Sequence, residues 1–154
     1  MTSNMTNQTI WNLKSKNLKS LNQKSMKEIL KNRSKKFAVE VIKVAEQMPN
    51  KPTYWAITNQ IIRSSTSVAA NYRAVCRAKS DKDFISKMGT VIEEADETLF
   101  WLELIEDLIN EGLEVKSHIQ LNELKNLQKE ANELVSIFVA SNLTIKKRLN
   151  NQQS

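Results

Sequence analysis

Apolar residues recur at helical spacing along most of the chain. From about residue 26 onward they fall three or four positions apart in four separate stretches, which is the pattern of one buried stripe on each of four helices. The third stretch repeats most regularly, in the 3-4-3 order typical of helices packed in a bundle. The expected inward positions are Leu30, Phe37, Val41, Val44 and Met48, then Ile57, Ile61, Val68, Tyr72 and Val75, then Ile85, Met88, Ile92, Ala95, Leu99 and Leu102, and finally Leu124, Leu127, Ala131, Leu134 and Phe138.

Residues that start or stop helices mark the ends of these stretches. An S-x-x-E capping box that begins at Ser25 predicts the start of the first helix, and Pro49 ends it. Ser80 is expected to cap the third helix and Gly112 to close it, because glycine tolerates the left-handed conformation found after helix ends. A second box, S-x-x-Q at Ser117, precedes the last helix. The predicted helices cover residues 26–48, 54–79, 81–111 and 118–142.

Short loops between the predicted helices make consecutive helices antiparallel neighbours. Residues 1–24 are polar and repetitive, with only scattered apolar positions, which is typical of a disordered tail. The chain is therefore expected to be all-α, with a disordered basic N-terminal tail at 1–24, an antiparallel up-down-up-down four-helix bundle at 25–143, and a basic, polar C-terminal tail at 144–154.

Composition narrows the function classes. Two glycines and two prolines among 154 residues are too few for the turns of a β-sandwich, a barrel or a Rossmann domain. Cys76 is the only cysteine and His118 the only histidine, which excludes an intramolecular disulfide and the paired Glu-x-x-His motifs of di-iron bundles. We expect a non-enzymatic cytoplasmic protein with no catalytic residues, no metal, no cofactor and no membrane partner.

Charge is strongly segregated along the sequence. The net charge of +6 is the sum of +7 over residues 1–48, +5 over 49–80, −9 over 81–115 and +3 over 116–154. In an antiparallel hairpin, Arg73 and Arg77 of the second helix are expected beside the first turns of the acidic third helix, with Glu93, Glu94 and Glu97 facing the middle of the second. We favour such pairing, between helices or between subunits, over direct phosphate contact by these arginines.

If helix pairing uses those arginines, the uncompensated positive charge lies in the tails and on the first helix. Flexible basic segments of this kind suit sequence-independent contacts to RNA or DNA phosphates. The candidate nucleic-acid-binding residues are Lys14, Lys16, Lys19, Lys24, Lys27, Lys31, Lys35, Lys36, Lys146, Lys147 and Arg148.

Four segments resemble a known family. They are residues 58–63 (TNQIIR), 67–74 (SVAANYRA), 84–88 (FISKM) and 93–103 (EEADETLFWLE). The chain is similar to the bacterial four-helix-bundle family named after proteins encoded in intervening sequences of 23S ribosomal RNA genes, whose relatives include the accessory variability protein of diversity-generating retroelements. Many relatives end the second segment in Glu-Gly, where this chain has Ala74 and Val75.

The resemblance implies a non-enzymatic bundle that forms a ring-shaped homo-oligomer, a pentamer, and in some relatives binds nucleic acid or a reverse transcriptase. It implies structural or interfacial roles for the matching residues, and the apolar surface around Trp101 suits subunit packing. Two hypotheses stay open: a self-assembling scaffold that binds nucleic acid, and a structural or protein-interaction module, such as a reverse-transcriptase accessory protein, that binds none. The candidate contact residues are Arg63, Asn71, Arg73, Arg77, Glu93, Glu94, Glu97 and Trp101.

Overall fold

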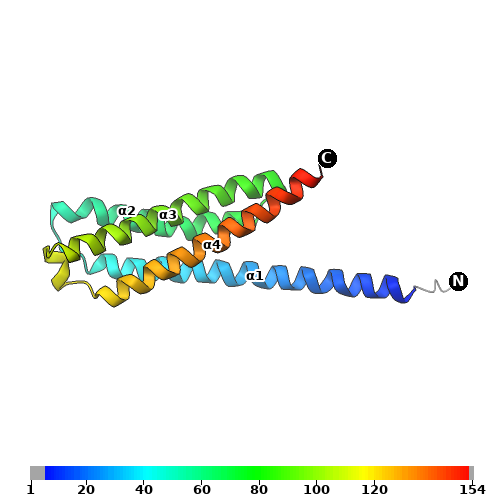
Figure 1. The fold of residues 1–154 in the computed structure, drawn as a ribbon, viewed down its shortest axis with the longest axis horizontal. Coiled ribbons are helices and arrows are strands. Elements are labelled where there is room, and N and C mark those ends of the chain that lie inside the picture. Colours follow the sequence, from blue (N-terminus) through cyan, green and yellow to red (C-terminus); the bar gives the residue numbers. More distant parts are fainter. Residues whose placement is uncertain (1–5, 153–154) are drawn as a thin grey trace.

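Four long helices make up the computed structural model, which describes residues 6–152 (Figure 1). Helices α1 and α2 are joined by a short proline-containing turn, and a single 3-10 turn, η1, precedes the last helix. The elements are α1 at Asn7–Glu46, α2 at Pro52–Val75, α3 at Asp81–Asn110, η1 at Glu114–Ser117 and α4 at Leu121–Asn151.

The helices pack in sequential order, which confirms the predicted up-down four-helix bundle. Helix α2 packs on α1 and α3, and α4 packs on α3 and, less extensively, on α1. Side chains from all four stripes fill the core, and Phe138 of α4 lies 5.3 Å from Tyr72 of α2 between ring centroids. Most of the expected inward positions are buried, because a period of 3.6 residues keeps them on one face of each helix.

The predicted ends of α3 are confirmed in atomic detail. The Ser80 hydroxyl accepts a hydrogen bond from the backbone N–H of Asp83 at 3.1 Å. At the other end Gly112 has a φ of 77°, and the N–H of Leu113 reaches back to the carbonyl of Leu108 at 3.1 Å. The Ser80 bond satisfies an N–H group that the start of the helix leaves free, and the Leu113 bond satisfies a carbonyl group near its end.

The prediction of a disordered tail is wrong for residues 7–24, and residues 1–5 lie outside the described part of the chain. Helix α1 starts at Asn7, where the Thr6 side chain accepts from the N–H of Thr9 at 3.3 Å, and the box at Ser25 lies inside the helix. No glycine or proline interrupts this stretch, and extending a helix that packing has already nucleated costs little per residue. As a result α1 projects beyond the other helices (Figure 1).

Two further boundaries differ from the prediction. Helix α2 ends at Val75 rather than 79, because i to i+3 hydrogen bonds from the N–H groups of Arg77 and Ala78 tighten its last turn. The Ser117 hydroxyl donates to the carbonyl of Glu114 within η1, so Gln120 rather than Ser117 precedes α4.

Helix α4 also extends farther than expected, so the predicted C-terminal tail is helical over residues 144–151. Its end is held to the start of α3 by an ion pair between Arg148 and Asp81. Residues 153 and 154 lie outside the described part. Within residues 6–152, none of the helices combines the length and apolar character needed to cross a membrane.

Candidate nucleic-acid interface

A groove with a volume of about 540 Å³ lies between α1 and α2. Its floor includes Ala69 and Ala70, whose small side chains leave the space between the two helices open. Basic side chains converge on it from both helices: Lys31 and Lys35 come from α1, whereas Arg73 lies near the end of α2 and Arg77 just beyond it. We call these four residues and the two alanines the basic groove.

The cations of the basic groove are almost entirely uncompensated. Among the described residues the side chains of Lys35, Arg73 and Arg77 have no hydrogen bond or ion pair, and Lys31 pairs only with exposed Glu28 of its own helix, at 2.6 Å. None of the described residues that line the groove is acidic. Four like charges held this close create a positive potential that attracts an anion.

Within one chain, the expectation that Arg73 and Arg77 pair with the start of α3 is therefore wrong. The acids there have other partners, since Asp81 binds Arg148 and Asp83 binds Lys87. Asp83 also accepts from the backbone N–H of Lys79 at 2.9 Å, and with Lys87 this lowers the pKa of its carboxyl. Arg73 and Arg77 instead line the groove beside α1, together with Lys31 and Lys35.

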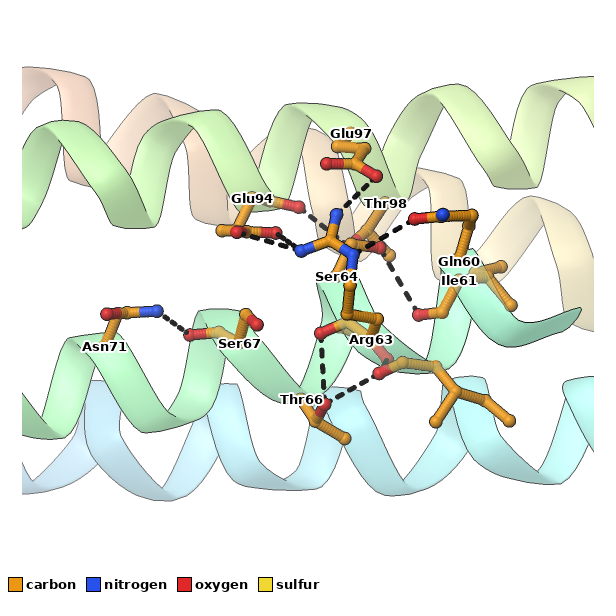
Figure 2. A network of polar contacts seen from close by, with 12 residues as sticks. Gln60, Ile61, Arg63, Ser64, Thr66, Ser67, Asn71, Glu94, Glu97 and Thr98 are labelled. Carbon is orange, nitrogen blue, oxygen red and sulfur yellow. Dashed lines mark hydrogen bonds and ion pairs between the residues drawn. The ribbon is translucent and has the colours of Figure 1, made fainter. Parts of the chain in front are cut away.

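One predicted pairing between α2 and α3 is confirmed, and it uses Arg63. The Arg63 guanidinium lies 3.0 Å from a carboxylate oxygen of Glu94 and 2.5 Å from one of Glu97, and it also donates to the side chain of Gln60 (Figure 2). Figure 2 shows Arg63 pointing toward α3, whereas Thr66, another residue that lines the groove, points toward α1. Arg63 therefore lies outside the groove.

The remaining candidate contact residues differ in their surroundings. The Trp101 ring is half-buried, and its N–H donates to the Glu97 carboxylate at 3.1 Å. The hydrogen bond from Arg63 lowers the pKa of the Glu97 carboxyl most, and the bond from Trp101 lowers it further. Asn71 donates to the carbonyl of Ser67 within α2 (Figure 2). Glu93 is exposed and its side chain has no partner in the described residues, so within the chain the expected pairing of Glu93 with α2 is wrong.

The candidate nucleic-acid-binding residues do not form one surface. Lys31 and Lys35 lie in the basic groove, whereas Arg148 is occupied by Asp81. Lys36 lines the groove between α1 and α4, and Lys27 lines the apolar cavity at the end of the bundle. The other lysines lie along the first part of α1 and at the end of α4: Lys14, Lys16, Lys19, Lys24, Lys146 and Lys147.

Other hollows offer a weaker basis for anion binding. The groove between α1 and α4, with a volume of about 440 Å³, is lined by both signs of charge and crossed by an ion pair between Arg33 and Glu130. A cavity of about 230 Å³ at the end of the bundle is largely apolar, and burial there raises the pKa of the Cys76 thiol. Within residues 6–152 no cluster of three or more His, Cys, Asp or Glu residues is placed to hold a metal ion.

A signal for the groove exists in the sequence. Thr66, Ala70, Arg73 and Arg77 are spaced 4-3-4, so they form one stripe of α2 whose small members precede its basic ones. The spacing alone does not say which neighbouring helix this stripe meets.

Comparison with known proteins places the chain in a family. The model of the 23S rRNA-intervening sequence protein family matches residues 26–140. The chain belongs to this family. A crystal structure of a protein of unknown function from the S23 ribosomal protein family of Bacteroides thetaiotaomicron is 30% identical, with a TM-score of 0.60, covering 72% of this chain and 95% of that one. No curated protein sequence matches. Within the 23S rRNA-intervening sequence protein family, this chain has an α1 that begins well before the matched range.

Proposed function

We propose that the protein is a non-enzymatic, self-assembling helical scaffold that binds the phosphate backbone of RNA or DNA in the basic groove. The observation that carries the proposal is the convergence of Lys31, Lys35, Arg73 and Arg77 with no acid among them. Cations that a fold needs for its own stability usually have partners, as Arg33 and Arg63 do here. Those of the groove remain available to a ligand.

The chemistry of the groove suits phosphodiesters. Guanidinium groups present planar forks of N–H donors that match two phosphate oxygens, and lysines add flexible point charges. Binding releases counterions condensed on the nucleic acid, so the affinity falls steeply as salt is added. No aromatic residue lines the groove to stack on bases, which favours contacts that ignore base sequence.

The self-assembly part of the proposal has separate support. Large apolar side chains are exposed on several helices, among them Trp11 on α1, Trp55 on α2 and Phe100 on α3, each more than half exposed. Tryptophan and phenylalanine are enriched at protein interfaces, where a partner covers their rings. The resemblance to proteins that form rings points the same way.

The same exposed side chains favour the alternative hypothesis, a protein-interaction module such as a reverse-transcriptase accessory protein with no nucleic-acid binding of its own. In that case the basic groove receives an acidic segment of the partner. Direct binding measurements separate the two functions.

Fluorescence anisotropy of labelled RNA and DNA, single- and double-stranded and of several base compositions, tests the proposal at low salt. We expect wild type to bind all base compositions similarly and Arg73→Ala/Arg77→Ala to bind at least about tenfold more weakly, since two phosphate contacts are lost. The matched control is Lys116→Ala/Lys129→Ala, which removes two exposed charges elsewhere and should bind much like wild type. Equal losses in both variants, or no binding by wild type, would overturn the proposal.

A further inference from the structure

The projecting part of α1 exposes an amphipathic surface that its own bundle does not cover. We call residues Asn7–Asn22 the arm. Every arm residue except Ser15 is exposed, including Trp11 at 64% and Leu18 at 61%. The arm also contains Lys14, Lys16 and Lys19 and no acid. The arm continues a helix of 40 residues, but none of its large apolar side chains is buried, and they gain stability only when a partner covers them.

A face of α3 has the opposite charge. Glu93, Asp96, Glu103 and Asp107 are spaced so that they lie on one side of the helix, and Phe100, 52% exposed, lies in the middle of them. The other acids of α3 have cations within the chain, such as Glu106 with Lys125, but among the described residues these four side chains have no partner. We call these five residues the acidic face.

From this charge complementarity we infer that the arm of one copy docks on the acidic face of a second copy. Lys14 and Lys19, which flank Trp11 and Leu18 on one side of the arm, approach the carboxylates while the exposed indole and leucine side chains pack around Phe100. The arm spans about 24 Å and the acidic face about 22.5 Å at ~1.5 Å per residue, so the two surfaces match in length. The inference rests on the self-assembly part of the proposed function.

The occupant of the acidic face cannot be the arm of the same chain. Helix α1 packs on α2 and α4 and makes no contacts with α3, and the arm projects away from the bundle (Figure 1). A contact between two different surfaces is heterologous, so each copy can bind one neighbour through its arm and another through its α3. Such contacts close into a ring where the rotation from copy to copy returns to the first one, and otherwise form an open filament. The arm lies outside residues 26–140, the part that matches the family, which makes this contact a feature of the present chain.

Sedimentation velocity of the full chain tests the inference, with charge reversals on each surface. The arm variant is Lys14→Glu/Lys19→Glu, the α3 variant is Glu103→Lys/Asp107→Lys, and a third chain combines all four substitutions. The control is Lys116→Glu/Lys129→Glu, exposed lysines outside both surfaces. Circular dichroism establishes that each variant is folded.

We expect wild type and the control to sediment as a multiple of the 17.7 kDa chain, the two single-surface variants to dissociate, and the combined variant to reassemble. Dissociation should also follow added salt, because exposed charges are screened. A wild type that remains monomeric contradicts both the inference and the self-assembly proposal. An assembled wild type whose single-surface variants keep its mass, or whose combined variant fails to reassemble, overturns the inference alone.

Other binding partners of the arm give different outcomes with the same variants. An arm variant with unchanged mass but weakened binding to labelled nucleic acid assigns the arm to phosphate contacts. If the wild-type chain is monomeric and co-sediments with anionic lipid vesicles, but the arm variant does not, the arm binds a membrane surface. Either result rejects the second copy as the occupant.

Discussion

Replacing Arg33 by alanine tests how the bundle closes between its first and last helices. Helices α1 and α4 share the least extensive of the four contacts between long helices, and a groove opens between them. Arg33 spans this gap, with Nε 2.6 Å from one oxygen of Glu130 and Nη2 2.8 Å from the other, and it lies 2.5 Å from Glu133. The substitution removes all three contacts at once.

The expected cost follows from the geometry and the exposure. Hydrogen bonds to charged groups contribute about 1.5–3 kcal/mol when shielded, and exposed ion pairs about 0–1 kcal/mol. The Arg33 side chain is 29% exposed and Glu133 is 49% exposed, so water screens part of the interaction. We expect Arg33→Ala to lower the free energy of unfolding by about 1–2 kcal/mol, which lowers Tm by about 2–8 °C for a domain of this size.

Urea denaturation measures this change, repeated at several protein concentrations because assembly adds to apparent stability. Arg33→Lys should recover less than half of the loss, since an ammonium cannot reproduce the fork that grips Glu130. A double-mutant cycle that combines Arg33→Ala with Glu130→Gln should give a coupling energy of about 1 kcal/mol. Lys43→Ala, which breaks an exposed pair with Glu40, serves as the control and should unfold near wild type. Wild-type stability in Arg33→Lys would refute the fork argument.

Three further predictions concern the basic groove, the hydrophobic core and the stability of the fold at low pH. Ala70→Glu adds a carboxylate to the groove at an exposed position, so anisotropy should show about tenfold weaker nucleic-acid binding with unchanged stability; unchanged affinity would count against the site. Phe138→Ala should cost about 3–5 kcal/mol in urea, because its ring is fully buried; a loss below about 1 kcal/mol would contradict that placement. Ion-pair and hydrogen-bond partners lower the folded-state pKa values of Asp83, Glu97 and Glu106, so their stabilisation is complete above about pH 5 and is lost as the pH falls through those lowered values. Thermal melts with the same Tm at pH 5 and pH 3 would disprove this.

The fold was predictable because burial follows a simple period. Val41, Ile61, Leu102 and Leu134 were expected to face inward, and all four are fully buried. The sequence pattern is reliable here since each helix must hide one apolar stripe, and four stripes joined by short loops admit few arrangements. The extent of α1 was not predictable in this way, because its arm has no stripe that its own bundle buries.

The basic groove was missed for a geometric reason. Arg73 lies ten residues after Arg63, which places it about 80° around the α2 axis at 3.6 residues per turn. That rotation is enough to move a side chain from the α3 side to the α1 side. It is smaller than the width of an apolar stripe, which is about 100°, so the sequence pattern does not resolve it. Only the packed structure shows that Arg63 forms an ion pair with Glu94, whereas Arg73 lines the same groove as Lys31 and Lys35.

The salt dependence of nucleic-acid binding tests the central claim most directly. The slope of log K against log salt counts the phosphate contacts, at about 0.9 for each contact to a duplex. Wild type should show a steep slope, and Arg73→Ala/Arg77→Ala a slope smaller by about 2. Identical slopes for the two proteins would contradict the claim that the basic groove binds the phosphate backbone.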